Sequence, residues 1–233
     1  MVASTDRRSR PNDSPMIPML DAEWFRSIYA GDMNGRWSAL MLTLTAIGGG
    51  WAMLAIVPLF AQSRTRAFAI ALTFTLGATS LTVFVLKSIV RRARPCVSLE
   101  GVHALCVAPS DYSFPSGHSA GSFAAAAFFS TLLLSASGAA PSDDAAPIRS
   151  ALTRALGAAA LFVVASGVAL SRVYLGVHFP GDVIAGASLG IGFGIVGGRL
   201  HAARIARGAS VSTNQEATIR EIQNTRGERT PHA

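Results

Sequence analysis

The sequence predicts an all-α integral membrane protein, a bundle of five or six transmembrane helices with a polar site at one membrane surface. Half of the 233 residues are hydrophobic and only 14% are charged, whereas soluble domains carry about 25% charged residues. Five long stretches without any charged side chain would leave too little polar surface for a water-soluble shell. They are 37–61, 67–86, 119–140, 155–171 and 183–198.

The segments outside these stretches are polar. In residues 1–36 a polar tail precedes a mixture of aromatic and acidic residues, typical of an amphipathic helix in the headgroup region or of a loose linker. Residues 37–200 form the predicted membrane domain, in which the last two stretches need flanking residues to cross the bilayer. Residues 201–233 are polar and predicted to be a flexible or weakly helical tail. With five spans, the loops at 87–118 and 172–182 lie on the same side of the membrane.

The first polar cluster is KSIVRRARP, residues 87–95. Lys87 is the one lysine in a chain with nineteen arginines, so its retention indicates that a compact ammonium is needed at this point, as for a phosphate oxygen. Arg94 can add a bidentate contact to the same anion. A basic stop signal at the end of a span is the alternative interpretation.

The second cluster is YSFPSGHSAGS, residues 112–122, where the third span begins. Ser116, Gly117 and His118 stand at this helix start, where free backbone N–H groups attract anions. An ordinary helix start would carry the same Pro-Ser-Gly sequence. His118 favours function, because an imidazole beside an anion can donate a proton to a leaving group.

The third cluster is SRVYLGVHFPGD, residues 171–182. Arg172 supplies a further guanidinium and His178 a nucleophilic imidazole, and Asp182 can accept the Nδ1 proton of His178 so that Nε2 is free to attack. Glycines continue the four-residue register at 186, 190, 194 and 198 and predict close approach of a neighbouring helix. The three clusters contain no ligand set typical of zinc or magnesium, so the sequence predicts phosphoryl transfer without a metal or other cofactor.

Taken together, the three clusters resemble the signature of the type 2 phosphatidic acid phosphatase superfamily. The matching elements are Lys87 with Arg94-Pro95, then Pro115-Ser116-Gly117-His118, then Ser171-Arg172 with His178 and Asp182. Every signature position is filled, over roughly residues 37–200. Many bacterial members have a third span before the lysine motif, which here is replaced by the amphipathic segment.

The resemblance implies a metal-independent phosphatase of lipid phosphates or pyrophosphates. His178 would form a phosphohistidine, Asp182 would orient it, and His118 would protonate the leaving group and then activate water. Lys87, Arg94, Ser116, the Gly117 amide and Arg172 would hold the phosphate.

Undecaprenyl pyrophosphate is the first expected substrate. Phosphatidic acid, phosphatidylglycerol phosphate, diacylglycerol pyrophosphate and lipid A phosphate are alternatives. Vanadium haloperoxidases share a similar anion site but are soluble, and a non-catalytic lipid-binding scaffold would not need both histidines and Asp182.

Charge predicts the location of the site. Arginines flank the spans mainly on the side opposite the three clusters, which by the positive-inside rule turns the clusters toward the periplasm or cell exterior of a bacterial inner membrane. Cys96 and Cys106 lie in one loop on that side and could form a disulfide there, or remain separate thiols. The net charge of +7 is dispersed over membrane flanks, which favours anionic lipid headgroups over nucleic acid as the partner.

Overall fold

The structure, a computed structural model, describes residues 19–31, 37–107, 109–135 and 146–227. All regular secondary structure in these ranges is helical, which confirms the all-α fold class. The elements are α1 (Met19–Ile28), α2 (Ser38–Ile47), the 3₁₀ helix η1 (Gly50–Phe60), α3 (Ser63–Val90), α4 (Pro95–Ser98), α5 (Gly117–Ser135), α6 (Ala146–Tyr174) and α7 (Pro180–Gly227).

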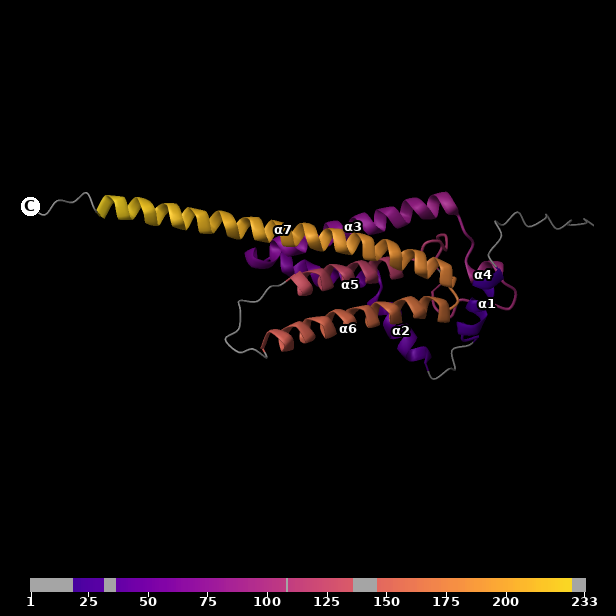
Figure 1. The fold of residues 1–233 in the computed structure, drawn as a ribbon. Helices are drawn as coiled ribbons and strands as arrows, with labels where there is room; N and C mark the ends of the chain where they lie inside the picture. Colours follow the sequence, from indigo (N-terminus) through magenta and orange to yellow (C-terminus); the bar gives the residue numbers. More distant parts are fainter. Residues whose placement is uncertain (1–18, 32–36, 108, 136–145, 228–233) are drawn as a thin grey trace, which may run out of the picture.

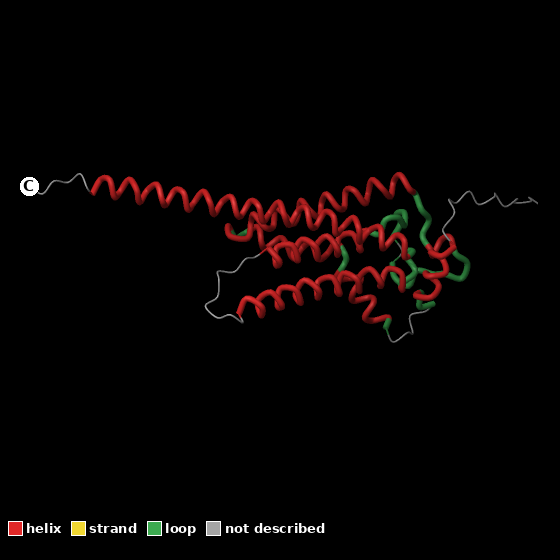
Figure 2. The backbone as a smooth tube through the Cα atoms, in the orientation of Figure 1, coloured by secondary structure: helices red, strands yellow, loops and turns green. Residues whose placement is uncertain are grey.

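Four helices in the described part of the chain, α3, α5, α6 and α7, are long and apolar enough to cross a membrane. They run side by side, with α1 and α4 gathered at one end of the bundle (Figure 1). The loop between α4 and α5 and the turn between α6 and α7 lie at that same end (Figure 2). These helices correspond to the last four predicted spans, although residues 136–140 of the predicted third span lie outside the described residues.

The first predicted span, residues 37–61, differs from the prediction because it is two shorter pieces, α2 and η1, instead of one helix. Three consecutive glycines, 48–50, separate the pieces, and glycine is about 1 kcal/mol less favourable than alanine inside a helix. Pro58, within η1, lacks the N–H that a continuing helix requires. Gly48 also permits close contact with α6, because a Cβ atom there would lie 2.2 Å from a methyl group of Val168.

The glycine stripe of α7 packs directly on the backbone of α5. A Cβ atom at Gly186 would lie 2.4 Å from the Ser116 carbonyl oxygen, and one at Gly190 would lie 2.2 Å from that of Ala120. Gly194 faces the Ala124 carbonyl oxygen in the same way. No side chain fits at these positions, so the predicted close approach is present and its partner is α5.

Beyond the bundle, α7 continues as a helix to Gly227, through most of the segment that the sequence predicted to be a flexible or weakly helical tail. Its first residue past the predicted domain boundary, His201, is buried and lies against the rings of Phe68 of α3 and Phe128 of α5. The packing of the bundle therefore includes the start of this segment.

Candidate active site

The three polar clusters of the sequence meet at the end of the bundle that carries α1 and α4. The Ser116 amide, before α5, donates to the Asp182 carbonyl in the first turn of α7 at 3.0 Å. Arg94, between α3 and α4, places Nη1 3.1 Å from Nε2 of His178. Segments that are 60 or more residues apart in the chain thus form one site.

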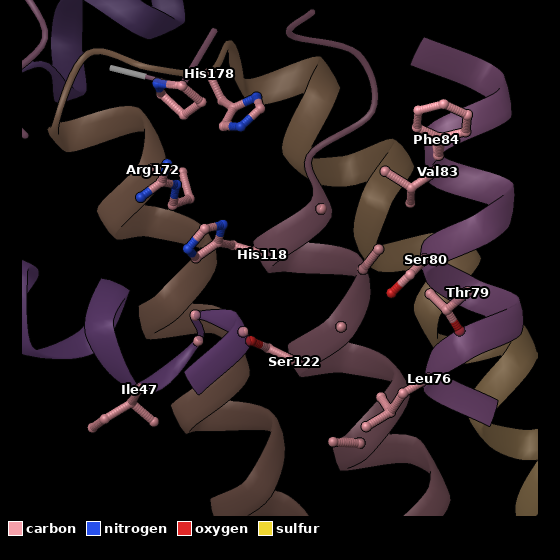
Figure 3. A pocket seen from close by; sticks show the side chains of 18 of the residues that line it. Ile47, Leu76, Thr79, Ser80, Val83, Phe84, His118, Ser122, Arg172 and His178 are labelled. Atoms are coloured by element: carbon pink, nitrogen blue, oxygen red, sulfur yellow. The ribbon is translucent and has the colours of Figure 1, made fainter. Parts of the chain in front are cut away.

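A cavity of about 660 Å³ opens at this site and continues between α3, α5 and the α2–η1 segment. In Figure 3, His118, Arg172 and His178 lie toward one end of the cavity, and Ile47 and Leu76 toward the other. Six of the eight predicted site residues line it: Lys87, Arg94, Gly117, His118, Arg172 and His178. The other two, Ser116 and Asp182, are fully buried behind its wall.

Lys87 and Arg94 are held by the loop that precedes α5. Asp111 Oδ2 lies 2.8 Å from Lys87 Nζ, and Asp111 Oδ1 lies 2.6 Å from Arg94 Nη2. Lys87 also donates to the Tyr112 carbonyl, and Arg94 Nε donates to the Asp111 carbonyl at 2.9 Å. Both cations are almost fully buried, whereas the Asp111 side chain is 53% exposed. One carboxylate therefore pairs with both cations at the mouth of the cavity and compensates half of their charge.

The electrostatics of Asp111 follow from this pairing. Partial burial acts to raise the pKa of the Asp111 carboxyl, but the hydrogen bonds and charges of Lys87 and Arg94 outweigh burial and hold the pKa below its ordinary value. Asp111 is therefore an anion at neutral pH.

His178 lies between Arg94 and Asp182. Because a guanidinium can only donate, the contact with Arg94 makes Nε2 the acceptor and leaves the proton on Nδ1. Nδ1 is 3.6 Å from Asp182 Oδ2 and 3.4 Å from Ser113 Oγ. The first separation is longer than a hydrogen bond, and Oδ2 accepts instead from Ser113 Oγ and, at 2.9 Å, from the Phe179 amide. Asp182 Oδ2 therefore faces the imidazole without a direct hydrogen bond, and Ser113 Oγ lies beside both groups.

The surroundings of His178 keep it neutral. Burial is the main cause that lowers the pKa of His178 to about 4, while Asp182 opposes the shift and the Arg94 and Arg172 guanidiniums add to it. A neutral imidazole at pH 7 has the lone pair that a nucleophile needs.

Arg172 and His118 line the cavity beside segments of the interrupted first span. Arg172 is almost fully buried and donates through Nη1 to Thr45 of α2, while its Nε has no hydrogen-bond partner within the described chain. His118 lies close to the glycine break, since a Cβ atom at Gly49 would be 3.9 Å from its Nε2. The broken span thus forms one wall of the site.

Sequence reasoning missed several residues of this region. Asp111 and Ser113 lie within four residues before the Pro-Ser-Gly-His motif. Their closeness to the motif could have marked them as candidate site residues. Arg92 lies inside the first basic cluster, in which the sequence analysis assigned roles only to Lys87 and Arg94. Asp21, which pairs with Arg92 at 2.6 Å, and Thr45 are far from every motif, and no pattern in the sequence marks them.

Two further sequence expectations concern this region. Cys96 and Cys106 are both free thiols in the structure, so the disulfide is not formed there. Among the described residues, no group of three or more His, Cys, Asp and Glu side chains is arranged to hold a metal ion.

Known proteins resemble this chain in both sequence and fold. Decaprenylphosphoryl-5-phosphoribose phosphatase of Mycobacterium tuberculosis H37Rv is 32% identical over 63% of this chain and 69% of its own length. The protein of the same name from Mycolicibacterium smegmatis is 33% identical over 59% of this chain and 62% of its own.

Two solved structures share the fold. A transmembrane PAP2 type phosphatidylglycerolphosphate phosphatase from Bacillus subtilis superimposes with a TM-score of 0.59 at 25% identity, over 77% of this chain and 83% of its own. Aquifex aeolicus LpxE gives a TM-score of 0.58 at 27% identity, over 76% and 94%. Residues 68–206, more than half of the chain, match the PAP2 superfamily. The chain therefore belongs to the PAP2 superfamily of membrane phosphatases, as its three motifs predicted, and is a phosphate-ester hydrolase.

Proposed function

We propose that this protein removes the terminal phosphate of a membrane lipid in two steps, through a phosphohistidine at His178 and without a metal ion. The observation that carries the proposal is the position of His178, a buried neutral imidazole where a group of cations meets a long apolar cavity. Catalysis by fixed cations aimed at the phosphoryl oxygens is electrostatic stabilisation of the kind that metal ions supply in other enzymes.

In the first step the lone pair of His178 Nε2 attacks phosphorus. Arg94 Nη1, now 3.1 Å from Nε2, turns to the phosphate and releases that lone pair. The bond from phosphorus to the leaving oxygen breaks, its electron pair stays with that oxygen, and His118 supplies the proton. Lys87, Arg94 and Arg172 share the negative charge of the equatorial oxygens, and the unpartnered Nε of Arg172 is a donor available for them.

In the second step water replaces the imidazole. His118, now deprotonated, takes a proton from the water as its oxygen attacks phosphorus, the P–N bond breaks, and orthophosphate leaves. The exposed backbone of Gly117 lines the cavity and adds its amide to the phosphate site. Ser116 lies behind the cavity wall and supports the phosphate site indirectly. Its hydroxyl accepts a hydrogen bond from Ser119 Oγ at 3.1 Å at the start of α5.

The apolar part of the cavity supports a lipid substrate. Along α3 it reaches from Lys87 to Leu72, about 22 Å at 1.5 Å per residue, which is most of a hydrocarbon core of roughly 30 Å. Ile56, Leu59 and Phe129 form other parts of the lining. A long hydrocarbon chain can lie there while its phosphate reaches the cations.

We propose a polyprenyl lipid that ends in a phosphate as the substrate class. The names of the curated relatives, decaprenylphosphoryl-5-phosphoribose phosphatases, favour a phosphorylated sugar on such a lipid, and the expected undecaprenyl pyrophosphate belongs to the same class. The name of the Bacillus subtilis structure supports phosphatidylglycerol phosphate as the second candidate.

We further propose that the site faces the periplasm or cell exterior of a bacterial inner membrane. Arg64 and Arg66 begin α3 at the end opposite the site, and Arg199, Arg204 and Arg207 lie near the far end of the apolar part of α7, Pro180–Gly208. Positive residues concentrate on the cytoplasmic side of membrane proteins, so this distribution supports an outward-facing site.

The first prediction concerns turnover. Purified protein in detergent with EDTA is expected to release orthophosphate from decaprenylphosphoryl-5-phosphoribose and undecaprenyl pyrophosphate faster than from phosphatidylglycerol phosphate or phosphatidic acid. His178→Ala should lower release by more than about a thousandfold, while a cooperative melting transition shows that the variant is still folded. Near-normal release by the variant would reject the nucleophile, and a need for added metal would reject the mechanism.

The second prediction concerns the ionisation of His178. With a pKa of about 4, the imidazole should stay neutral as the pH falls through 6 and 5, and should charge only near pH 4. Nitrogen NMR of histidine-labelled protein, assigned with His178→Ala, measures the midpoint. Asp182→Asn should move the midpoint downward, because Asp182 favours the charged imidazole. A midpoint near the ordinary value would contradict the buried, neutral nucleophile.

The third prediction concerns Asp111, whose carboxylate pairs with Lys87 and Arg94, the two cations that would bind the phosphate. Asp111→Asn is expected to tighten inhibition by orthovanadate about fivefold, since releasing a partly exposed ion pair is worth about 1 kcal/mol. Glu100→Gln, an exposed carboxylate in the same loop, is the matched control. Weaker vanadate inhibition in Asp111→Asn would mean that Asp111 holds the cations in place instead of competing for them.

A further inference from the structure

We infer that α1 completes the active site, with Asp21 as a positioning residue that acts through Arg92 and the start of α7 on Asp182 and His178. The inference rests on the proposed function of His178. It assigns a role to a helix that precedes the membrane spans and that no signature motif includes.

Asp21 makes two contacts with its single carboxylate. Oδ2 lies 2.6 Å from Arg92 Nη2, and Oδ1 accepts the Gly181 amide at 2.8 Å. The Asp21 side chain is 11% exposed and that of Arg92 is 14% exposed, so water screens the ion pair only weakly. The second contact satisfies one of the free N–H groups in the first turn of α7 and places a negative charge at that helix end.

Arg92 connects Asp21 to Asp182, because its guanidinium pairs with both carboxylates. Its Nη1 lies 2.7 Å from Asp182 Oδ1, and its guanidinium carbon lies 4.2 Å from the centre of the Phe179 ring. A fully buried carboxylate is costly unless a cation compensates it. With Oδ1 held by Arg92, Oδ2 is the oxygen turned toward His178 Nδ1, so Arg92 sets which way the carboxylate faces.

Helix α1 is held in place by apolar contacts that do not involve Asp21. Phe25 is fully buried, with its ring centre 5.3 Å from that of Tyr29 and 5.6 Å from that of Phe179. The Tyr29 hydroxyl donates to the His103 carbonyl at 2.9 Å. Leu20 and Trp24 are largely exposed, as expected for residues that face the headgroup region. A substitution at Asp21 should therefore leave the helix docked.

The start of α7 is fitted closely to Asp21. A Cβ atom at Gly181 would lie 2.9 Å from Asp21 Oδ2, so a side chain there would displace the carboxylate. Gly181 directly precedes Asp182. The contact is thus specific to this residue pair, and Gly181→Ala perturbs the same link from its other side.

Neither Asp21 nor Arg92 lines the cavity. A residue that only positions the nucleophile changes the rate of the chemical step, whereas a residue that holds phosphate changes its affinity. The expected signature of Asp21 variants is a lower kcat with unchanged KM and unchanged vanadate inhibition.

The test compares Asp21→Asn and Asp21→Ala with Glu23→Gln, an exposed carboxylate of the same helix. In Asp21→Ala we expect kcat to fall roughly tenfold to a hundredfold, because a small misplacement of a reacting group has effects of that size. Asp21→Asn keeps an acceptor for the Gly181 amide and should fall between Asp21→Ala and wild type. Gly181→Ala should lower kcat in wild type but add little in Asp21→Ala, since both substitutions break one link.

Hydrogen exchange of residues 176–183 gives a readout independent of turnover, and it should accelerate in Asp21→Ala but not in Glu23→Gln. The inference is overturned if exchange and kcat of Asp21→Ala match wild type, if KM rises as much as kcat falls, or if Glu23→Gln has the same loss. A wild-type protein inactive on every lipid phosphate would reject the proposed function, and the exchange comparison would then decide alone whether Asp21 fixes the start of α7.

Discussion

The backbone contact between α5 and α7 is the constraint on which the rest of the site depends. Because glycines of α7 lie against carbonyl groups of α5, the two helices approach more closely than side chains would allow. The contact continues to the site, where the Ser116 amide donates to the Asp182 carbonyl. The starts of both helices therefore come together, and with them the segments that carry His118 and His178.

The second requirement is charge compensation. Lys87, Arg94, Arg172 and Asp182 are all buried, and buried charges need partners. Asp111 pairs with Lys87 and Arg94 at the cavity mouth, and Asp182 pairs with Arg92, which Asp21 also contacts. The Asp111 side chain is largely exposed, so in the proposed mechanism it is the partner that an incoming phosphate replaces. Asp182 is fully buried and stays beside His178.

The sequence predicted the features that depend on residues close together in the chain, namely the spans, one helix contact and the three motifs. Four spans followed from runs without charge, and the helix contact of α7 followed from glycines at four-residue spacing. The three motifs carried Lys87, His118 and His178 because the spacing within each motif is short. Three glycines and Pro58 interrupt the first span, but the prediction used only the length of the uncharged run, which does not register such interruptions.

The rest could not be predicted, because it depends on contacts between distant segments. Asp21 reaches Arg92 across 71 residues and Gly181 across 160, and no periodicity links such positions. The N-terminal amphipathic pattern indicated a helix at the membrane surface, but it could not reveal that Phe25 packs on the protein. Likewise, the polar composition after residue 200 did not indicate that His201 of α7 is buried against α3 and α5.

The most direct test of the account is to find the covalent intermediate. Rapid mixing of the His118→Ala variant with a lipid phosphate substrate, followed by alkaline quench and peptide mass spectrometry, should detect a phosphoryl group that is stable to base and labile to acid on the peptide containing His178. The substrate is undecaprenyl pyrophosphate, because its leaving group is a phosphate that departs with less need of the His118 proton than an alkoxide. Loss of the base for the second step should then let the intermediate accumulate in His118→Ala. A phosphoryl group on another residue, or none while orthophosphate is still released, would contradict histidine as the nucleophile.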